Sequence, residues 1–243
     1  MKILGQKLNQ DEFRNYVETY NFGSIKPDGI VIHHTWRPTK KDWNGEKSIM
    51  GLKNYYEGLG WSAAPHIFIA EDGIWLFTPM TEVGIHAGEG NAVWERLGRQ
   101  YRGFKGPIGS KLKGYTIGIE VVGDYDVERW TGHTFSNALS SIRILMDTLA
   151  IDNEHVTFHR DWTDQKSCPG HAITKDWLFA ELSKRDSHGS PKPVDVSGVS
   201  PWAKEAFDWQ IENDLDRSVT PHQKVEAEWV FAMIKKYHDK FGK

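Results

Sequence analysis

The sequence has little cysteine, little net charge and no long apolar run, and each shortage excludes something. Its single cysteine, Cys168, cannot form an internal disulfide, so a use for this thiol must be sought elsewhere. The net charge is −3 and no long lysine or arginine run occurs, so the charge gives no reason to expect nucleic acid or an anionic membrane as a partner. No run of about 18 apolar residues is present to span a membrane.

The first residues carry no targeting signal that we can identify. Residues 1–10 contain no apolar stretch long enough for a signal peptide. We therefore expect synthesis in the cytoplasm, with a separate route of release if the substrate lies outside. The eleven tryptophans are an unusual load, and any that are exposed would suit sugar rings or an interaction surface.

The order of expected elements predicts an α/β domain over residues 1–185, with a mixed central β-sheet flanked by helices. Apolar runs indicate strands, and apolar residues three and four positions apart indicate helices. Thr134 is the expected N-cap of the helix at 135–150. The strands are expected at 30–32, 65–70, 74–77, 115–123 and 156–158, and the helices at 11–20, 48–59, 135–150 and 174–182.

The C-terminal part differs in composition. Residues 186–198 are rich in proline, glycine and serine, as linkers are. Residues 199–243 predict two amphipathic helices, and about 45 residues are marginal for independent folding. We expect a small helical module that packs on a partner or on the main domain.

Three residues far apart in the sequence are candidate metal ligands. Cys168 lies in an irregular loop, nine positions after His159, and a thiolate with an imidazole suits Zn²⁺. A third ligand must come from elsewhere, and His33, at the end of strand 30–32, is the strongest candidate. Its neighbour His34 competes, because alternate strand residues face opposite sides. Taken singly, His159 could be a surface or capping histidine and Cys168 a small buried hydrophobe.

Three further polar residues have both a functional and a structural interpretation. Glu120 lies within an apolar strand, where an unpaired carboxylate is costly, so it either pairs with a cation or acts as a general base in a cleft. Lys166 is two residues before Cys168 and would stabilise an oxyanion, or be a solvated loop lysine. His86, in a glycine-rich segment, is either a substrate contact or a plain loop histidine.

Several motifs in this order resemble the zinc-dependent N-acetylmuramoyl-L-alanine amidases of the type 2 amidase and peptidoglycan-recognition-protein superfamily. The resemblance spans roughly residues 30–182. The motifs are Ile30-Val31-Ile32-His33-His34-Thr35, the hairpin 65–73, His86-Ala87-Gly88, Thr116-Ile117-Gly118-Ile119-Glu120, and His159 with Lys166-Ser167-Cys168-Pro169-Gly170.

This resemblance implies a site and a reaction. His33, His159 and Cys168 would ligate Zn²⁺, with Glu120 as general base and Lys166 as polarising cation. Some relatives carry a catalytic tyrosine where this chain has Pro65 before His66, so the branch that uses glutamate and lysine is the better match. The chain also has one residue more between histidine and cysteine than several relatives have. We expect the substrate-binding residues to be His86, His66 and Trp61.

The expected function is hydrolysis of bacterial peptidoglycan at the amide between N-acetylmuramic acid and L-alanine, in the manner of a phage or prophage endolysin. The zinc site is expected at one edge of the sheet. A recognition module without activity is an alternative, although members that only bind usually lack the cysteine. A zinc peptidase cutting within the stem peptide is another.

The C-terminal segment is similar to an S-layer-homology motif at 199–206, 212–215 and 219–220. Such modules are associated with binding cell-wall polymers, but they usually come in several copies. Asp214 and Pro221 also depart from the usual residues. A structural or dimerising helical hairpin is the alternative.

Overall fold

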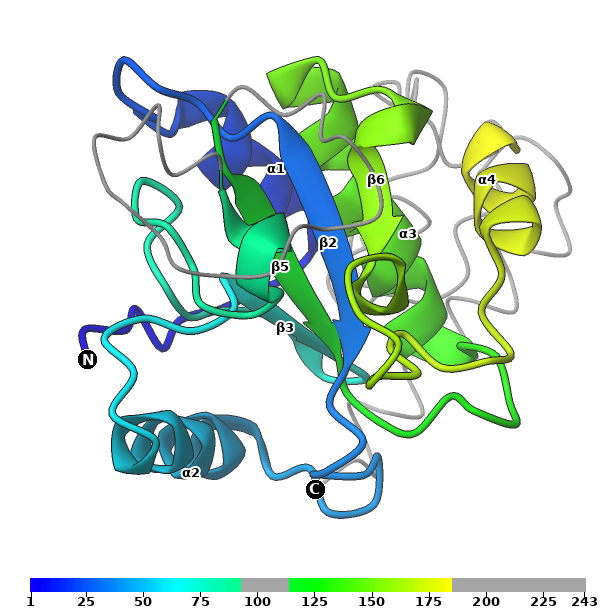
Figure 1. Ribbon diagram of the computed structural model, residues 1–243, viewed down its shortest axis with the longest axis horizontal. Coiled ribbons are helices and arrows are strands. Elements are labelled where there is room, and N and C mark those ends of the chain that lie inside the picture. Colours follow the sequence, from blue (N-terminus) through cyan, green and yellow to red (C-terminus); the bar gives the residue numbers. More distant parts are fainter. Residues whose placement is uncertain (93–113, 185–243) are drawn as a thin grey trace, which may run out of the picture. The chain divides into compact units, whose positions relative to one another are not determined.

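The computed structural model describes residues 1–92 and 114–184 (Figure 1). The expected linker at 186–198 and the expected helical module at 199–243 lie outside this part of the chain. The boundary expected at residue 185 therefore stays a prediction.

The described residues form a mixed six-stranded sheet with the strand order β1-β4-β3-β5-β2-β6. The central strand β5 is parallel to both of its neighbours, β2 and β3, and β2 is also parallel to the edge strand β6. The hairpin β3–β4 and the short β1 are antiparallel additions at the other side. The strands are β1 (Lys7–Leu8), β2 (Gly29–His34), β3 (Ile67–Ala70), β4 (Gly73–Leu76), β5 (Thr116–Val121) and β6 (Val156–Phe158).

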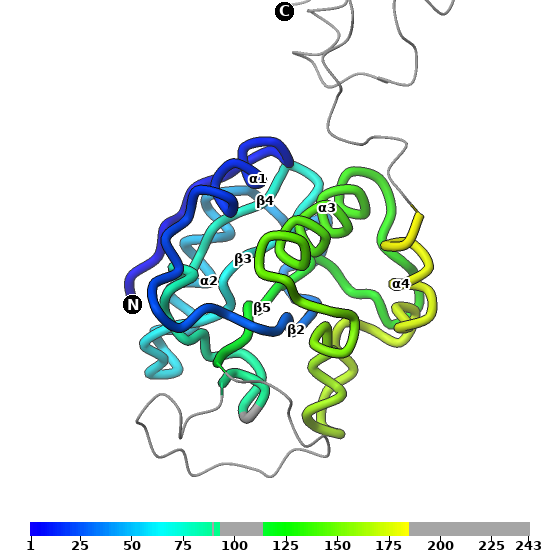
Figure 2. Tube along the Cα trace, turned by 90° about the horizontal axis from the view of Figure 1, so that it is seen from above, coloured from blue at the N-terminus to red at the C-terminus, as the bar shows by residue number. Residues whose placement is uncertain are grey.

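The four expected helices are present and cover the sheet unequally. They are α1 (Gln10–Thr19), α2 (Gly45–Gly58), α3 (Gly132–Leu149) and α4 (Lys175–Ser183). Helices α1 and α3 lie side by side on one face, and α2 lies beyond the β3–β4 hairpin on the other (Figures 1 and 2). Among the described residues, no helix has the length and apolar character needed to cross a bilayer. The expected mixed sheet flanked by helices is confirmed.

Alternation along the strands explains why polar groups collect on one face. In β2, Ile30 and Ile32 belong to the main core shared with α1 and α3, whereas Val31 belongs to a separate cluster on the opposite face. His33 follows in the same alternation as Val31, because successive side chains of a strand point to opposite sides. The polar end of β2 therefore presents His33 on the face away from α1 and α3.

The start of α3 differs from expectation. The helix begins at Gly132 with Thr131 as its N-cap, and not at Thr134. Glu71, at the β3–β4 turn, accepts hydrogen bonds from the backbone N–H groups of His133 and Thr134 at 3.2 and 3.0 Å. It also accepts one from the Thr134 hydroxyl at 3.0 Å. A carboxylate from elsewhere in the chain thus serves the free N–H groups of the helix start and complements its dipole.

Candidate metal centre

The site is built where three strands end. In register, His33 of β2 lies opposite Glu120 of β5, and Glu120 lies opposite Phe68 of β3. Cross-strand partners point to the same face, so the imidazole and the carboxylate share one side of the sheet. The edge strand β6 pairs with β2 and ends at Phe158, which delivers His159 beside them.

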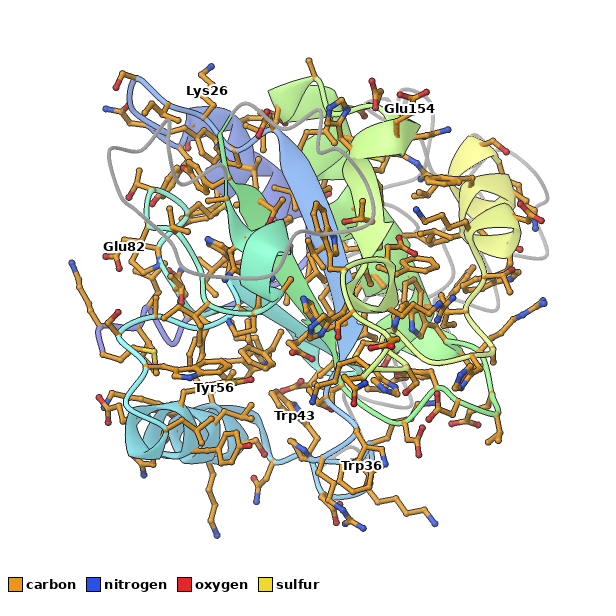
Figure 3. All side chains as sticks on the ribbon, viewed as in Figure 1. Lys26, Trp36, Trp43, Tyr56, Glu82 and Glu154 are labelled. Carbon is orange, nitrogen blue, oxygen red and sulfur yellow. The ribbon has the colours of Figure 1, made fainter. Side chains whose placement is uncertain are left out.

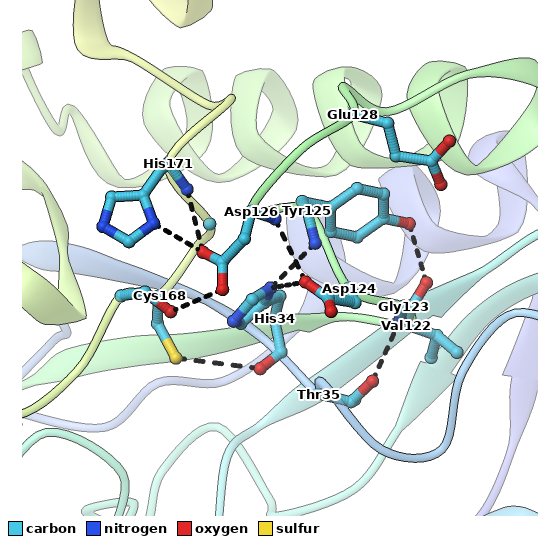
Figure 4. Close-up of polar contacts among 12 residues, drawn as sticks. His34, Thr35, Val122, Gly123, Asp124, Tyr125, Asp126, Glu128, Cys168 and His171 are labelled. Atoms are coloured by element: carbon cyan, nitrogen blue, oxygen red, sulfur yellow. Dashed lines mark hydrogen bonds and ion pairs between the residues drawn. The ribbon is translucent and has the colours of Figure 1, made fainter.

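The structure brings together the three expected metal ligands. The Nδ1 atoms of His33 and His159 are 3.0 Å apart, and one ligand atom each from His33, His159 and Cys168 lie within 4.8 Å of one another. His34 is on the opposite face, where its Nδ1 accepts a hydrogen bond from the Tyr125 N–H at 3.1 Å (Figure 4). Only one histidine of the pair therefore points into the cluster.

The protonation of this cluster suits a cation that accepts lone pairs. Burial, and then the neighbouring His159 and His86, hold the pKa of His33 well below its usual range. Burial and then Lys166 lower the pKa of His159 to about 4. Both imidazoles are therefore neutral, which is the form that binds metals. Two imidazole nitrogens and a sulfur form a donor set that fits Zn²⁺.

The thiol of Cys168 needs a nearby cation to ionise. Burial, and then the charge of Glu120, raise its pKa to about 11. The sulfur is partly buried, and its S–H, a weak donor, donates to the His34 carbonyl at 3.7 Å. A divalent ion bound to the sulfur would reverse this preference, because coordination removes the thiol proton.

Arg160 connects the two ligand-bearing segments. It follows His159 directly, and its backbone N–H donates to the Cys168 carbonyl at 3.1 Å. Its guanidinium donates to the carbonyls of Ser167 and Gly170 at 3.0 and 2.9 Å, and to that of Ile173 at 2.6 Å. One side chain thus ties the cysteine loop to the histidine segment through a fixed fork of donors.

Asp126 holds the same loop from the other side (Figure 4). Its Oδ2 accepts from the Ser167 hydroxyl at 3.2 Å, and its Oδ1 accepts from the backbone N–H and the Nδ1 of His171 at 3.1 and 2.9 Å. Gly170, with φ 103°, packs so closely on the Tyr125 backbone that no Cβ would fit. The path of the cysteine loop is therefore fixed on both sides of the thiol.

Glu120 is prepared to accept a proton. It is 9% exposed, and its Oε2 is buried without a hydrogen-bond partner among the described residues. Burial raises its pKa to about 8, and the charge of Lys166 opposes that rise. Lys166 itself is exposed, and its charge acts to lower the pKa values of His33, His159, Glu120 and Cys168.

The three expected substrate contacts occupy different environments. His86 is 7% exposed, and its Nδ1 lies 3.1 Å from the His33 Nε2. His66 is fully buried, and its two nitrogens contact backbone groups of Glu82 and Gly118 at 2.9 Å. Both ring nitrogens of His66 are thus bonded to the backbone, and its expected contact with substrate stays a prediction. Trp61 is partly buried and stacks on Tyr56, with ring centroids 5.3 Å apart.

Tyr56 is a site neighbour that sequence reasoning missed. It lies on the side of α2 that faces the sheet (Figure 3), is 8% exposed and packs against Phe77. Burial, and then the charges of Glu120 and Cys168, raise its pKa well above the usual range. In the sequence it fits the apolar stripe of the helix, so no signal separated it from the core. Arg160 was missed for a different reason, because its partners are backbone carbonyls. Asp126 was missed because its partners Ser167 and His171 lie 41 and 45 positions away in the sequence.

The chain belongs to the family described as N-acetylmuramoyl-L-alanine amidase (Amidase_2), which residues 23–171 match. This membership indicates amidase activity on peptidoglycan. Comparison with curated protein sequences gave no match.

Solved structures are similar at low identity. The amidase LysC from Clostridium intestinale URNW is 22% identical, with 65% of this chain and 86% of that chain covered and a TM-score of 0.48. Drosophila PGRP-LB is 21% identical, with coverages of 70% and 86% and a TM-score of 0.47. The Ph2119 endolysin from the Thermus scotoductus MAT2119 bacteriophage Ph2119 is 16% identical, with coverages of 71% and 97% and a TM-score of 0.44. The family assignment rests on the family match alone.

Proposed function

We propose that this chain is a zinc-dependent hydrolase that cleaves the amide between N-acetylmuramic acid and L-alanine of the peptidoglycan stem. The observation that carries the proposal is the convergence of His33, His159 and Cys168 beside the buried carboxylate of Glu120. Family membership gives the class of bond, and the N, N, S donor set gives the metal.

The residues divide the chemistry between them. When bound, Zn²⁺ acts as a Lewis acid that lowers the pKa of a water toward about 7 and polarises a carbonyl. Glu120 takes the proton of the attacking water, holds it, and delivers it to the nitrogen of the leaving L-alanine. Its raised pKa suits both steps, because a general base and acid works best with a pKa near the working pH.

Lys166 would stabilise the negative charge that develops on the oxygen of the scissile carbonyl. The effect of its charge on the pKa values of Glu120 and His159 supports this role. A fixed positive charge stabilises a developing oxyanion more than the neutral ground-state carbonyl, so it lowers the barrier. The same charge keeps part of the Glu120 population ionised, which links the two roles.

The biological role that we propose is that of an endolysin from a phage or prophage. The protein would act on the cell wall after release from the cell that makes it. Residues 199–243 would form a helical module that binds a cell-wall polymer. These proposals rest on the sequence pattern and on family membership.

Metal analysis of the full-length chain tests the proposal. We expect one zinc per chain, and we expect Cys168→Ser to lose both the zinc and the release of soluble fragments from purified peptidoglycan. A folded wild-type chain that hydrolyses peptidoglycan without any bound metal would refute the zinc mechanism. A chain that binds zinc and peptidoglycan without hydrolysis would instead support the recognition module.

A further inference from the structure

Four groups contact one another in a line: the Gly90 carbonyl, the Thr116 hydroxyl, the His86 imidazole and the His33 imidazole. The Thr116 hydroxyl donates to the Gly90 carbonyl at 2.6 Å. The Thr116 oxygen lies 3.5 Å from the His86 Nε2, and the His86 Nδ1 lies 3.1 Å from the His33 Nε2. His33 then presents its Nδ1 to His159. All three linked side chains are at most 7% exposed, so water does not compete for these contacts.

The chemistry of the first group fixes the direction of the whole line. The proton of Thr116 goes to a backbone carbonyl, and its second close neighbour, the Asn91 carbonyl at 3.4 Å, is also an acceptor only. The Thr116 oxygen is therefore free to accept from His86 Nε2–H. A neutral imidazole with a proton on Nε2 has a bare Nδ1. His86 Nδ1 thus accepts from His33 Nε2–H, and the lone pair of His33 is left on Nδ1.

His86 is held in this orientation by its surroundings. The Asn91 side-chain oxygen accepts from the backbone N–H groups of His86 and Ala87 at 3.0 and 2.6 Å. The imidazole lies against Gly118, where an added Cβ would come within 2.6 Å of its Cδ2. These contacts hold the ring in one position.

We propose that His86 and Thr116 are positioning residues that select the His33 tautomer with a bare Nδ1, the nitrogen that faces His159. This inference rests on the proposed zinc site and adds two residues that do not touch the ion. Partners of this kind orient a ligand histidine and raise its basicity, and their loss costs about 10–100-fold in metal affinity. His86 would thereby act through the metal ligand.

The first test determines the His33 tautomer in the wild-type chain. In metal-free wild-type chain labelled with ¹⁵N-histidine, His33 should show a protonated Nε2 and an unprotonated Nδ1, its signals being assigned by their loss in His33→Gln. A His33 with its proton on Nδ1 would overturn the inference. This result stands apart from zinc binding, so a wild-type chain without zinc affinity would end the proposed function while the tautomer is still decided.

The second test measures zinc affinity by competition with a chromophoric chelator. His86→Leu removes the acceptor and should weaken zinc binding about 10–100-fold. His86→Asn, whose Oδ1 stands near the position of the imidazole Nδ1, should restore binding to within a few-fold of wild type. Equal affinity of His86→Leu and wild type would contradict the inference.

Thr116→Val tests the far end of the line against a matched control. Thr78 is also a buried threonine whose hydroxyl donates to a backbone carbonyl, that of Ala64 at 2.9 Å, but it lies outside the line. We expect Thr116→Val to weaken zinc binding and to populate the second tautomer of His86, whereas Thr78→Val should leave both unchanged. The same response from both variants would reduce Thr116 to a packing role.

Discussion

The Nδ1 atoms of His33 and His159 lie 3.0 Å apart, although 126 positions separate the residues in the chain. Two lone pairs at this distance repel each other unless a proton or a metal ion lies between them. Both rings are neutral at neutral pH and keep one N–H each, so in the metal-free chain an Nδ1–H of one ring can donate to the bare Nδ1 of the other. A cation that binds both nitrogens would take the place of that proton. The ends of β2 and β6 thus bring together two nitrogens that favour metal binding.

Adjacent histidines give a direct test of this relationship. His33→Gln should lower zinc occupancy of the purified chain to background, because one of three ligands is lost. His34→Gln is the matched control, since His34 faces Tyr125 on the other side of the strand, and it should retain zinc with some loss of stability. Atomic absorption of the two variants decides the point. Loss of zinc from His34→Gln alone would show that the ligand assignment is reversed.

Glu120 should make the stability of the metal-free protein depend on pH. Its pKa rises from 4.5 to about 8 on folding, so the stabilisation is complete below pH 4.5 and is lost as pH rises through 8. Glu120→Gln lacks this dependence, and its thermal midpoint should exceed that of wild type by a margin that widens between pH 5 and 8. The difference at pH 8 is at most on the order of 4 kcal/mol. If the thermal midpoints of wild type and Glu120→Gln differ by the same amount at every pH from 5 to 8, Glu120 is not a buried ionisable group.

The same substitution should remove activity without removing zinc. A lost general base lowers the rate by about 10²–10⁴-fold. The measurement is the initial rate of fragment release, with metal content determined on the same sample. A rate near that of wild type would exclude Glu120 from proton transfer.

Lys166→Met should change the pH profile as well as the rate. The Lys166 charge lowers the pKa of Glu120, so its removal should move the acidic limb of kcat/KM to higher pH. Lys53→Met is a suitable control, because Lys53 pairs with Glu57 on α2 at 2.7 Å. If Lys166→Met lowers the rate equally at all pH values, the lysine stabilises charge on the substrate but does not tune Glu120.

Arg160→Lys should loosen the cysteine loop. A lysine retains the charge but cannot hold the three carbonyls that the guanidinium reaches, so zinc affinity should fall by about tenfold, in the range seen for groups behind the ligands. Arg143→Lys is the control, because Arg143 donates to the carbonyls of Glu181 and Leu182. Equal zinc affinity in both variants would mean that the loop keeps its path without Arg160.

The sequence predicted those parts of the fold that depend on local pattern. The strand β5 with Glu120 inside it, and the end of β2 at His33–His34, were both predicted from the sequence. Buried strands contain runs of apolar residues, so a polar residue within or after such a run is easily recognised. The convergence on Cys168 was an expectation from motifs, and the structure places the three side chains together. No short window of sequence contains that information.

Other features depend on contacts that the sequence pattern does not record. Arg160 donates to backbone carbonyls of the cysteine loop, and any loop of the same path would offer the same carbonyls. Asp126 binds Ser167 and His171 across 41 and 45 positions of sequence. Glu71 accepts hydrogen bonds at the start of a helix 63 positions away. The local pattern does not record this contact and predicted Thr134 as the N-cap, whereas the cap is Thr131. His66 carried the same sequence signal as a site histidine, yet both its nitrogens serve the backbone. Residue type alone does not distinguish these uses.

Mass spectrometry of the fragments that the full-length chain releases from purified peptidoglycan tests the central claim most directly. We predict stem peptides with a free amino terminus on L-alanine, together with glycan strands that keep their lactyl groups, and no such products after zinc removal. New amino termini on glutamate, with L-alanine still attached to the glycan, would show a peptidase and contradict the proposed reaction.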